Sequence, residues 1–213
     1  MSSDNDALKT FYEKIWKTRG TRFIAAARLK HMNGLSVASV AILSVYVLLI
    51  STLAIVFQKM LSDLGQSVLN AANISLSIII LAFSLIENAR NHLGNSDAMT
   101  SCAMALSKIY NKFQPRYLDK AVSSDQLLKF SEEYDGVIAS CPLNHLLIDL
   151  DKFKQENRDQ FGLSGCENLI TRWQISAAWW LSILWLYLLA IVLPPVVLWV
   201  LFFHFGTAFI VTH

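Results

Sequence analysis

The residues that could carry chemistry in this sequence are few. Cys141 and His145 are four positions apart, and Cys102 and Cys166 lie in the same region of the chain. Thiolate and imidazole groups bind zinc, but a structural zinc site needs four well-placed ligands, and this spacing supplies only one close pair. The sequence also contains no Gly-rich phosphate loop, nucleophile elbow, HExxH pair or CxxC pair. It therefore predicts no metal site, no cofactor and no catalytic residue.

A second set of polar residues lies inside an apolar segment. These residues follow spacings of i, i+3, i+7 and i+14, which places them near one stripe of a helix. They are Asn70, Asn73, Ser77 and Ser84. Uncompensated polar groups are costly in lipid, so we expect this stripe to face protein or water. Two interpretations remain open: hydrogen bonding between packed helices, or the lining of a pore in an oligomer.

Ionisable groups are scarce in the apolar segments. Glu87 and Arg90 lie one helical turn apart at the end of the segment that carries the stripe. They could form an ion pair or be solvated at a helix end. His204 lies within the last apolar run, where it is either a functional group or a neutral histidine bonded to a neighbouring helix. Because no strongly charged residue lies in mid-span, a coupled ion or proton pump is not indicated.

Three long charge-free runs must position these residues. They are Met32–Gln58, Gly65–Ile86 and, apart from its histidines, Trp173–His213. A helix needs about 20 apolar residues to cross the hydrocarbon layer of a bilayer. The 213-residue chain has only 16% charged residues, whereas a soluble domain has roughly 25%. We therefore predict an all-α integral membrane protein, with a two-span transmembrane hairpin over residues 34–88.

The C-terminal apolar block, residues 173–213, is longer than one ordinary span. Pro194 and Pro195 divide it into two parts, and each part has about the length of one crossing. This division predicts a tight helical hairpin, four spans in total and a cytoplasmic C-terminus. The alternative is one long span kinked at the prolines, because membrane helices tolerate proline.

The distribution of Lys and Arg predicts the orientation. Residues 1–33 are rich in Lys and Arg, whereas the link between the first two spans holds only Lys59 and Asp63. Short loops rich in these residues stay cytoplasmic. The N-terminal segment and the central region, residues 89–172, are therefore expected inside the cell. All three cysteines fall in the central region, and we expect them to be reduced and buried.

Residues 1–33 are predicted to form a basic amphipathic helix. Its apolar side chains, Leu8, Phe11, Tyr12, Ile15 and Trp16, recur on one helical face. This face either packs on the protein's own cytoplasmic part or lies on anionic lipid headgroups. The central region is predicted to be a helical bundle. One helix should begin near Ser96 and end before Pro115, a second should start with a capping box at Ser123 and Gln126, and Pro142 should end it.

Residues 12–30 form an aromatic and basic stretch with a Trp-x-Thr-Arg core and a later Arg-Leu pair. The matching positions are Trp16, Thr18, Arg19, Arg22, Phe23, Arg28 and Leu29. This stretch resembles the N-terminal signature of the SLATT proteins, which are bacterial membrane effectors of nucleotide-signalling and reverse-transcriptase defence systems. The second span around 75–80, Glu87, the segment 141–145 and Asp149 resemble the subgroup often encoded beside reverse transcriptases.

The resemblance implies a membrane effector of antiphage defence that is quiet until a partner senses infection. It would then oligomerise, permeabilise or depolarise the bacterial inner membrane, and cause abortive infection. The implied partners are the lipid bilayer, further copies of the chain, and a cytosolic sensor such as a reverse transcriptase or a nucleotide-signalling protein. No direct nucleic-acid binding is expected. The candidates for coupling or regulation are Trp16, Thr18, Arg19, Arg22, Arg28, Glu87 and Arg90, and the polar stripe is the candidate for the conducting path.

Two other functions remain open at this stage. The chain could be a membrane anchor or sensor subunit that recruits a cytosolic defence enzyme, because a basic helix and a cytoplasmic bundle fit that role equally well. A small-solute transporter is less well supported, since the spans lack charged or Gly-broken sites at their centres. We do not expect the chain to be an enzyme.

Overall fold

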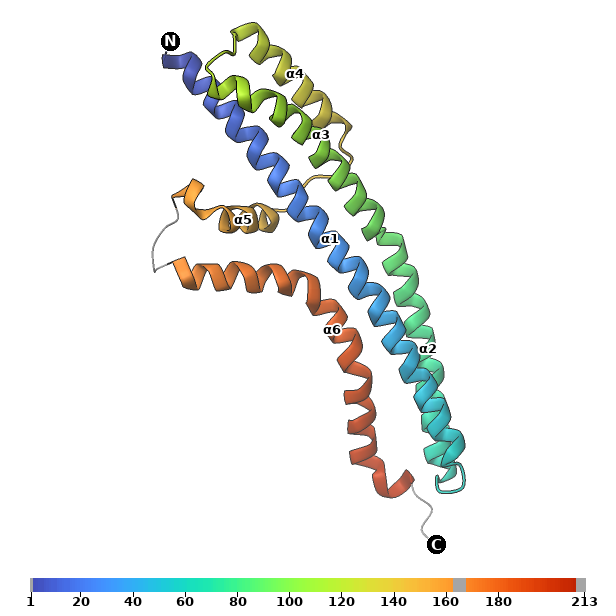
Figure 1. Ribbon diagram of the computed structural model, residues 1–213. Coiled ribbons are helices and arrows are strands. Elements are labelled where there is room, and N and C mark those ends of the chain that lie inside the picture. Colours follow the sequence, from blue (N-terminus) through green and yellow to red (C-terminus); the bar gives the residue numbers. More distant parts are fainter. Residues whose placement is uncertain (1, 163–167, 210–213) are drawn as a thin grey trace. The chain divides into compact units, whose positions relative to one another are not determined.

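The computed structural model describes residues 2–162 and 168–209, with the side chains of 6–162, 171–200 and 203. Within these residues every regular element is a helix (Figure 1). The elements are α1 (Ser2–Val56), α2 (Asp63–Arg90), α3 (His92–Leu118), α4 (Ser124–Ser140), α5 (Leu147–Glu156), the short 3₁₀ helix η1 (Arg158–Phe161) and α6 (Asn168–Phe209). The predicted all-α class is confirmed.

Three stretches of the described chain are long and apolar enough to cross a membrane. They lie in α1, in Asp63–Leu118, and in the Thr171–Val200 part of α6. The predicted hairpin at the prolines is corrected, because α6 continues through Pro194 and Pro195 as one helix. Each proline removes one backbone donor and crowds the preceding turn, but a long apolar helix can keep its course through such a site. His204 belongs to α6, while its side chain and His213 lie outside the described residues.

Contacts between residues divide the chain into two compact units, each of which is described by itself. The first, which we call the polar unit, comprises residues 1–31 and 92–182. The second, which we call the apolar unit, comprises residues 32–91 and 183–213. Helices α1 and α6 each contribute residues to both units.

The core of the polar unit forms where the amphipathic face of α1 meets α3 and α4. Phe11 and Ile15 of α1 are buried against Leu106 and Phe113 of α3 and Tyr134 of α4. The rings of Phe11 and Phe113 meet edge to face with centroids 5.2 Å apart. The apolar face of the basic helix is therefore packed inside protein. The capping box of α4 is confirmed, because Ser123 and Gln126 exchange side-chain and backbone hydrogen bonds.

Two expectations for the central region are corrected. Pro115 lies inside α3, which ends three residues later at Leu118. Pro115 removes the hydrogen bond that its own nitrogen would donate to the Asn111 carbonyl, but only three residues of α3 follow it, so the disturbance affects little of the helix. Cys102 and Cys141 are joined by a disulfide rather than reduced. The packing of α3 against α4 places the Cα atoms of the two cysteines 6.0 Å apart, a separation that suits a disulfide bond. Cys166 lies outside the described residues.

In the apolar unit, α1 and α2 form the predicted antiparallel hairpin, and part of α6 packs on it. The core side chains are Leu43, Ile50 and Leu76, with Ala190 and Leu198 of α6 packed against them. Ser62 caps the start of α2 by accepting a hydrogen bond from the Gly65 amide over 3.1 Å. Asn91 follows the last residue of α2 in the left-handed conformation, with φ of 46°.

Candidate functional site

The polar stripe of α2 makes one direct contact with α1. The side-chain amide of Asn73 donates a hydrogen bond to the Ser51 hydroxyl over 2.8 Å. The Ser51 hydroxyl in turn donates to the Val47 carbonyl, one turn back on α1. Asn73 thus contributes to packing within the hairpin, as expected for a polar residue between helices in lipid.

Asn70 and Asn73 also line a cavity of about 190 Å³ between α1 and α2. Ser51, Gln58 and Gln66 complete its polar lining. The side-chain oxygen of Asn73 is buried and has no hydrogen-bond partner among the described residues. A buried acceptor without a donor costs about 1–3 kcal/mol, and a polar cavity of this size has room for several water molecules. The hairpin therefore contains a pocket suited to water inside an otherwise apolar unit.

Ser77 and Ser84 are not part of this pocket. Ser77 is exposed, and its hydroxyl donates to the Asn73 carbonyl of its own helix over 2.8 Å. Ser84 is half-buried. The structure thus brings two of the four stripe residues together at the contact with α1. Ser77 lies instead on a surface of α2 that is open to a neighbouring molecule or to lipid.

Glu87 is the buried carboxylate of the apolar unit, with 5% of its surface exposed. It forms the expected ion pair with Arg90, in which Nη1 lies 2.9 Å from Oε1. Its second oxygen accepts a hydrogen bond from the hydroxyl of Tyr187 over 2.7 Å. Tyr187 belongs to α6, and sequence reasoning missed it, because nothing in the local pattern marks a tyrosine 100 positions away as a partner. The only available signal for such a partner was that a buried carboxylate needs hydrogen-bond donors.

The candidate coupling residues at the start of the signature fasten α1 to three other helices of the polar unit. The ring of Trp16 packs on Phe153 of α5 with centroids 4.8 Å apart. The Thr18 hydroxyl lies 3.1 Å from the hydroxyl of Tyr134 in α4. The guanidinium of Arg19 lies 4.1 Å above the ring of Tyr110 in α3, a cation–π contact.

Arg22 meets the segment between α4 and α5. It is 4% exposed, and its Nη1 donates to the Leu143 carbonyl over 3.0 Å. Its Nε atom has no hydrogen-bond partner among the described residues. Burial lowers the pKa of Arg22 from its ordinary value. Burial also lowers the pKa of His145, and the charge of Arg22 adds to this effect, while Asp149 opposes it.

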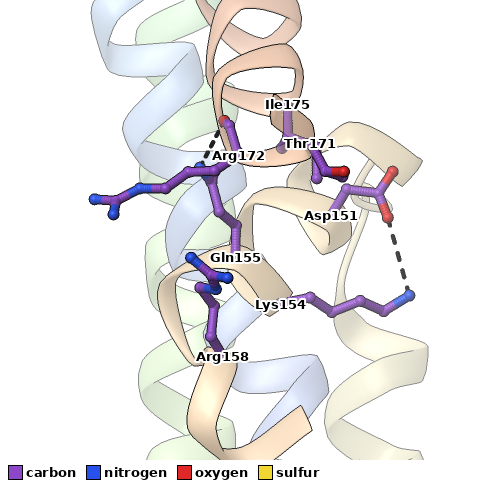
Figure 2. A pocket seen from close by; sticks show the side chains of 7 residues that line it. All are labelled: Asp151, Lys154, Gln155, Arg158, Thr171, Arg172 and Ile175. Atoms are coloured by element: carbon purple, nitrogen blue, oxygen red, sulfur yellow. Dashed lines mark hydrogen bonds and ion pairs between the residues drawn. The ribbon is translucent and has the colours of Figure 1, made fainter. Parts of the chain in front are cut away.

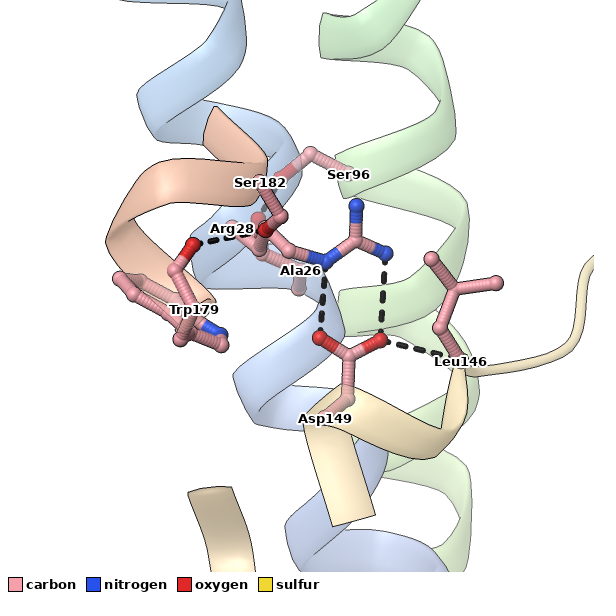
Figure 3. Close-up of polar contacts among 7 residues, drawn as sticks. All are labelled: Ala26, Arg28, Ser96, Leu146, Asp149, Trp179 and Ser182. Atoms are coloured by element: carbon pink, nitrogen blue, oxygen red, sulfur yellow. Dashed lines mark hydrogen bonds and ion pairs between the residues drawn. The ribbon is translucent and has the colours of Figure 1, made fainter. Parts of the chain in front are cut away.

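Arg28 and Asp149 form a buried ion pair between α1 and α5 (Figure 3). Two parallel hydrogen bonds join them, Nε to Oδ1 over 2.8 Å and Nη2 to Oδ2 over 3.1 Å. Asp149 also accepts a hydrogen bond from the Leu146 amide, which caps the start of α5. The sequence marked both residues through their resemblance to a signature, but their pairing across 121 positions could not be predicted.

The sequence profile of the SMODS and SLOG-associating 2TM effector domain family 5, SLATT_5, matches residues 4–201. The chain belongs to this family. Searches of curated proteins and of solved structures gave no match. The SLATT_5 match includes the apolar hairpin, the Arg28–Asp149 pair and most of α6, and it confirms the resemblance seen in residues 12–30. The membrane character of this SLATT chain agrees with the family description.

A small cavity of the SLATT_5 chain lies at the contact between α5 and the start of α6, and charged side chains of both signs line it (Figure 2). The Gln155 side chain donates to the Arg172 carbonyl over 2.8 Å and to the Ser176 hydroxyl over 3.0 Å. Lys154 and Arg158 line the same cavity. Lys154 is paired with Asp151, with Nζ 3.9 Å from Oδ1, and the side chain of Arg172 points away from this pair (Figure 2).

Proposed function

We propose that this SLATT_5 protein is a non-enzymatic effector of bacterial antiphage defence that oligomerises and opens a path for ions through the inner membrane. The family description supports the effector role. The observation that carries the path is the polar cavity between α1 and α2, because a site suited to water inside an apolar hairpin has a cost in lipid that a conducting function would explain. Activation is then a population shift, in which a partner binds the open arrangement more tightly than the closed one.

The proposed orientation places the N-terminus and the polar unit in the cytoplasm, where a disulfide such as Cys102–Cys141 is usually transient. The support for this orientation is the excess of Lys and Arg before the first span and the presence of Lys154, Arg158 and Arg172 in the segment before the last. Cationic side chains resist translocation across the membrane, so their presence next to a span favours the cytoplasmic side. In this orientation the polar unit is the part of the protein that a cytosolic partner can reach.

A cleft on the polar unit is the proposed contact for that partner. It has a volume of about 590 Å³, and its lining includes Tyr12, Trp16, Tyr110, Lys9 and Lys17. The hydroxyls of Tyr12 and Tyr110 lie 2.6 Å apart, which fixes the cleft wall to both α1 and α3. Tyr and Trp side chains are enriched in the binding surfaces of proteins. We propose that a reverse transcriptase or a nucleotide-signalling protein acts here and that Trp16 to Arg28 transmit the signal.

The test is the membrane potential of cells that express the chain, alone and with the proposed sensor under phage challenge. We expect depolarisation only with the trigger. Asn73→Leu, which removes the polar cavity's central amide, and Ser77→Leu, which removes an exposed hydroxyl of the stripe, should each abolish it. Ser67→Leu is the control, because the Ser67 hydroxyl makes the same local bond to a backbone carbonyl of α2 but lies off the stripe. Full depolarisation by both stripe variants would show that the stripe is not in the path.

The alternative function is a membrane anchor or sensor subunit for a cytosolic defence enzyme. The observation that favours it is the buried core of the polar unit, which holds the walls of the cleft in place. Binding of a partner in this cleft would therefore require no pore. Membrane fractionation of the partner separates the two functions. A partner that moves to the membrane with this chain while the potential stays intact would identify an anchor, and Arg19→Glu should then release it.

A further inference from the structure

The apolar unit has a second cavity, an open groove between α1, α2 and α6. Its volume is about 550 Å³. Small side chains, Ala71 and Ala72 on α2 and Ala190 on α6, leave this room, and Leu43, Leu193 and Val197 are among the larger side chains around it. Of the residues that line it, only Ser75 has a polar side chain. The cavity is therefore distinct in position and chemistry from the polar one between α1 and α2.

Neither water nor vacuum suits this cavity. A buried water molecule needs two to four polar partners, which one serine cannot provide to a volume of this size. Protein interiors contain few voids larger than a water molecule, because an empty space forfeits the dispersion contacts of its lining. An apolar cavity of about 150 Å³ is known to bind a six-carbon ring, so by proportion 550 Å³ accommodates on the order of 20 carbon atoms.

The length of the groove suits one extended chain. Its lining on α2 runs from Val68 to Phe83, which corresponds to about 20 Å along a helix. This length is of the same order as the roughly 15 Å depth of one leaflet of the hydrocarbon core. A single acyl chain that lies along the helices could therefore cover this lining.

We propose that the cavity between α1, α2 and α6 binds one acyl chain of a membrane phospholipid. The bilayer around a membrane helix supplies such chains at high concentration, and the apolar lining matches their chemistry. Phe83 lines the cavity and meets the ring of Tyr187 edge to face, with centroids 6.3 Å apart. A bound chain thus supports the side chain that hydrogen-bonds Glu87, and it fills the space between α6 and the hairpin. This binding site does not depend on the conducting path.

The test is native mass spectrometry of the purified full-length chain in detergent, with a mixture of phosphatidylethanolamine and phosphatidylglycerol added. We expect one phospholipid to remain bound under collisional activation that removes the others. Ala72→Trp fills the cavity and should reduce this retention at least fivefold. Ile78→Trp is the matched control, because Ile78 is a 63% exposed residue of α2 outside the cavity, and the variant should retain the lipid.

A second measurement covers the case in which Ala72→Trp does not fold. A phospholipid with a photoreactive group on its acyl chain should cross-link the unaltered protein at buried cavity residues such as Leu76, whereas a headgroup-labelled lipid should not. The proposal is overturned if no lipid is retained or if cross-links spread evenly over the exposed apolar residues. It is also overturned if Ala72→Trp leaves the lipid count unchanged but abolishes an oligomer, since a second copy would then occupy the cavity. Because both readouts measure binding, neither depends on ion conduction.

Discussion

The hydroxyl of Tyr187 and the carboxylate of Glu87 are joined by a hydrogen bond of 2.7 Å that connects α6 to α2. Glu87 has almost no exposed surface, and Arg90 holds its other oxygen. A buried carboxylate with two donors is compensated, but with one donor removed it retains part of its desolvation cost. The contact therefore adds a hydrogen bond between α6 and the hairpin to the apolar packing of the buried Tyr187 ring.

Tyr187→Phe should lower the free energy of unfolding in detergent by about 1–2 kcal/mol, because it removes one hydrogen bond to a charged group and leaves the ring in place. The measurement is denaturant-induced unfolding followed by tryptophan fluorescence. Tyr46→Phe is the control, since the Tyr46 ring packs on the same core and its hydroxyl bonds to no described residue. Equal losses in the two variants would contradict the role given to the Glu87 contact.

Breaking the Arg28–Asp149 pair should destabilise the polar unit strongly. Arg28→Ala should lower its free energy of unfolding by about 3–5 kcal/mol, because Asp149 is then left as a buried, unpaired charge. Limited proteolysis should show early cleavage within α5, whose first turn Asp149 caps. Lys112→Ala is the matched control: its pair with Glu133 is exposed, and its loss should cost less than about 1 kcal/mol. Similar losses of stability in the two variants would contradict the larger contribution assigned to the buried Arg28–Asp149 pair.

Gly20 allows Phe153 of α5 to lie directly on α1. A Cβ atom at this position would overlap the Phe153 ring. Gly20→Ala should therefore lower the midpoint of thermal unfolding, although alanine favours a helix. Gly136→Ala in α4 should raise it by an amount that corresponds to at most about 1 kcal/mol, because nothing lies within 4 Å of its Cβ and only the helix preference changes. A rise in both variants would mean that Phe153 moves aside without cost.

The stability of the polar unit should depend on pH through His145. Burial and the nearby charge of Arg22 lower the pKa of this histidine below 6.5 in the folded protein. As the pH falls through about 6.5, the unfolded state binds a proton that the folded state resists, so folding loses stability. The loss continues down to the folded pKa at no more than about 1.4 kcal/mol per pH unit. Thermal unfolding at pH 7.5 and 5.5 should show it.

His145→Gln removes the titrating group and should flatten this part of the pH profile while leaving stability at pH 7.5 nearly unchanged. A profile with the same slope in the variant would assign the pH dependence to other groups.

Local and compositional features could be predicted from the sequence, and distant pairings could not. The hairpin follows from charge-free runs, the capping box of α4 from a spacing of three, and the Glu87–Arg90 pair from one helical turn. The partners of Arg28 and Glu87 lie 121 and 100 positions away, and many other polar residues were equally eligible. The Cys102–Cys141 bond was missed because the expectation of reduced cysteines rested on the redox environment of the cytoplasm. That environment says nothing about how close the two cysteines lie in the fold.

A single helix through Pro194 and Pro195 was expected only as the alternative to a hairpin, for a different reason. A pair of prolines ends most helices in water, where the chain can turn and solvate its backbone. In lipid the alternative, an unbonded turn, costs more than two lost hydrogen bonds, so a helix that passes through both prolines is the less costly arrangement. The rules for soluble helices therefore overestimated the break, while hydropathy correctly identified the whole segment as apolar.

Pro194 and Pro195 have no amide hydrogens, so the carbonyls of Ala190 and Ile191 lack their usual donors one turn earlier in α6. The bending stiffness of a helix comes largely from this ladder of hydrogen bonds, and sharp bends concentrate where it is interrupted. At this one place along α6, a change of direction breaks no further backbone bond. Bending of α6 therefore costs least between the turn that carries Tyr187 and the turn that carries Leu198, and both of these turns pack on the hairpin.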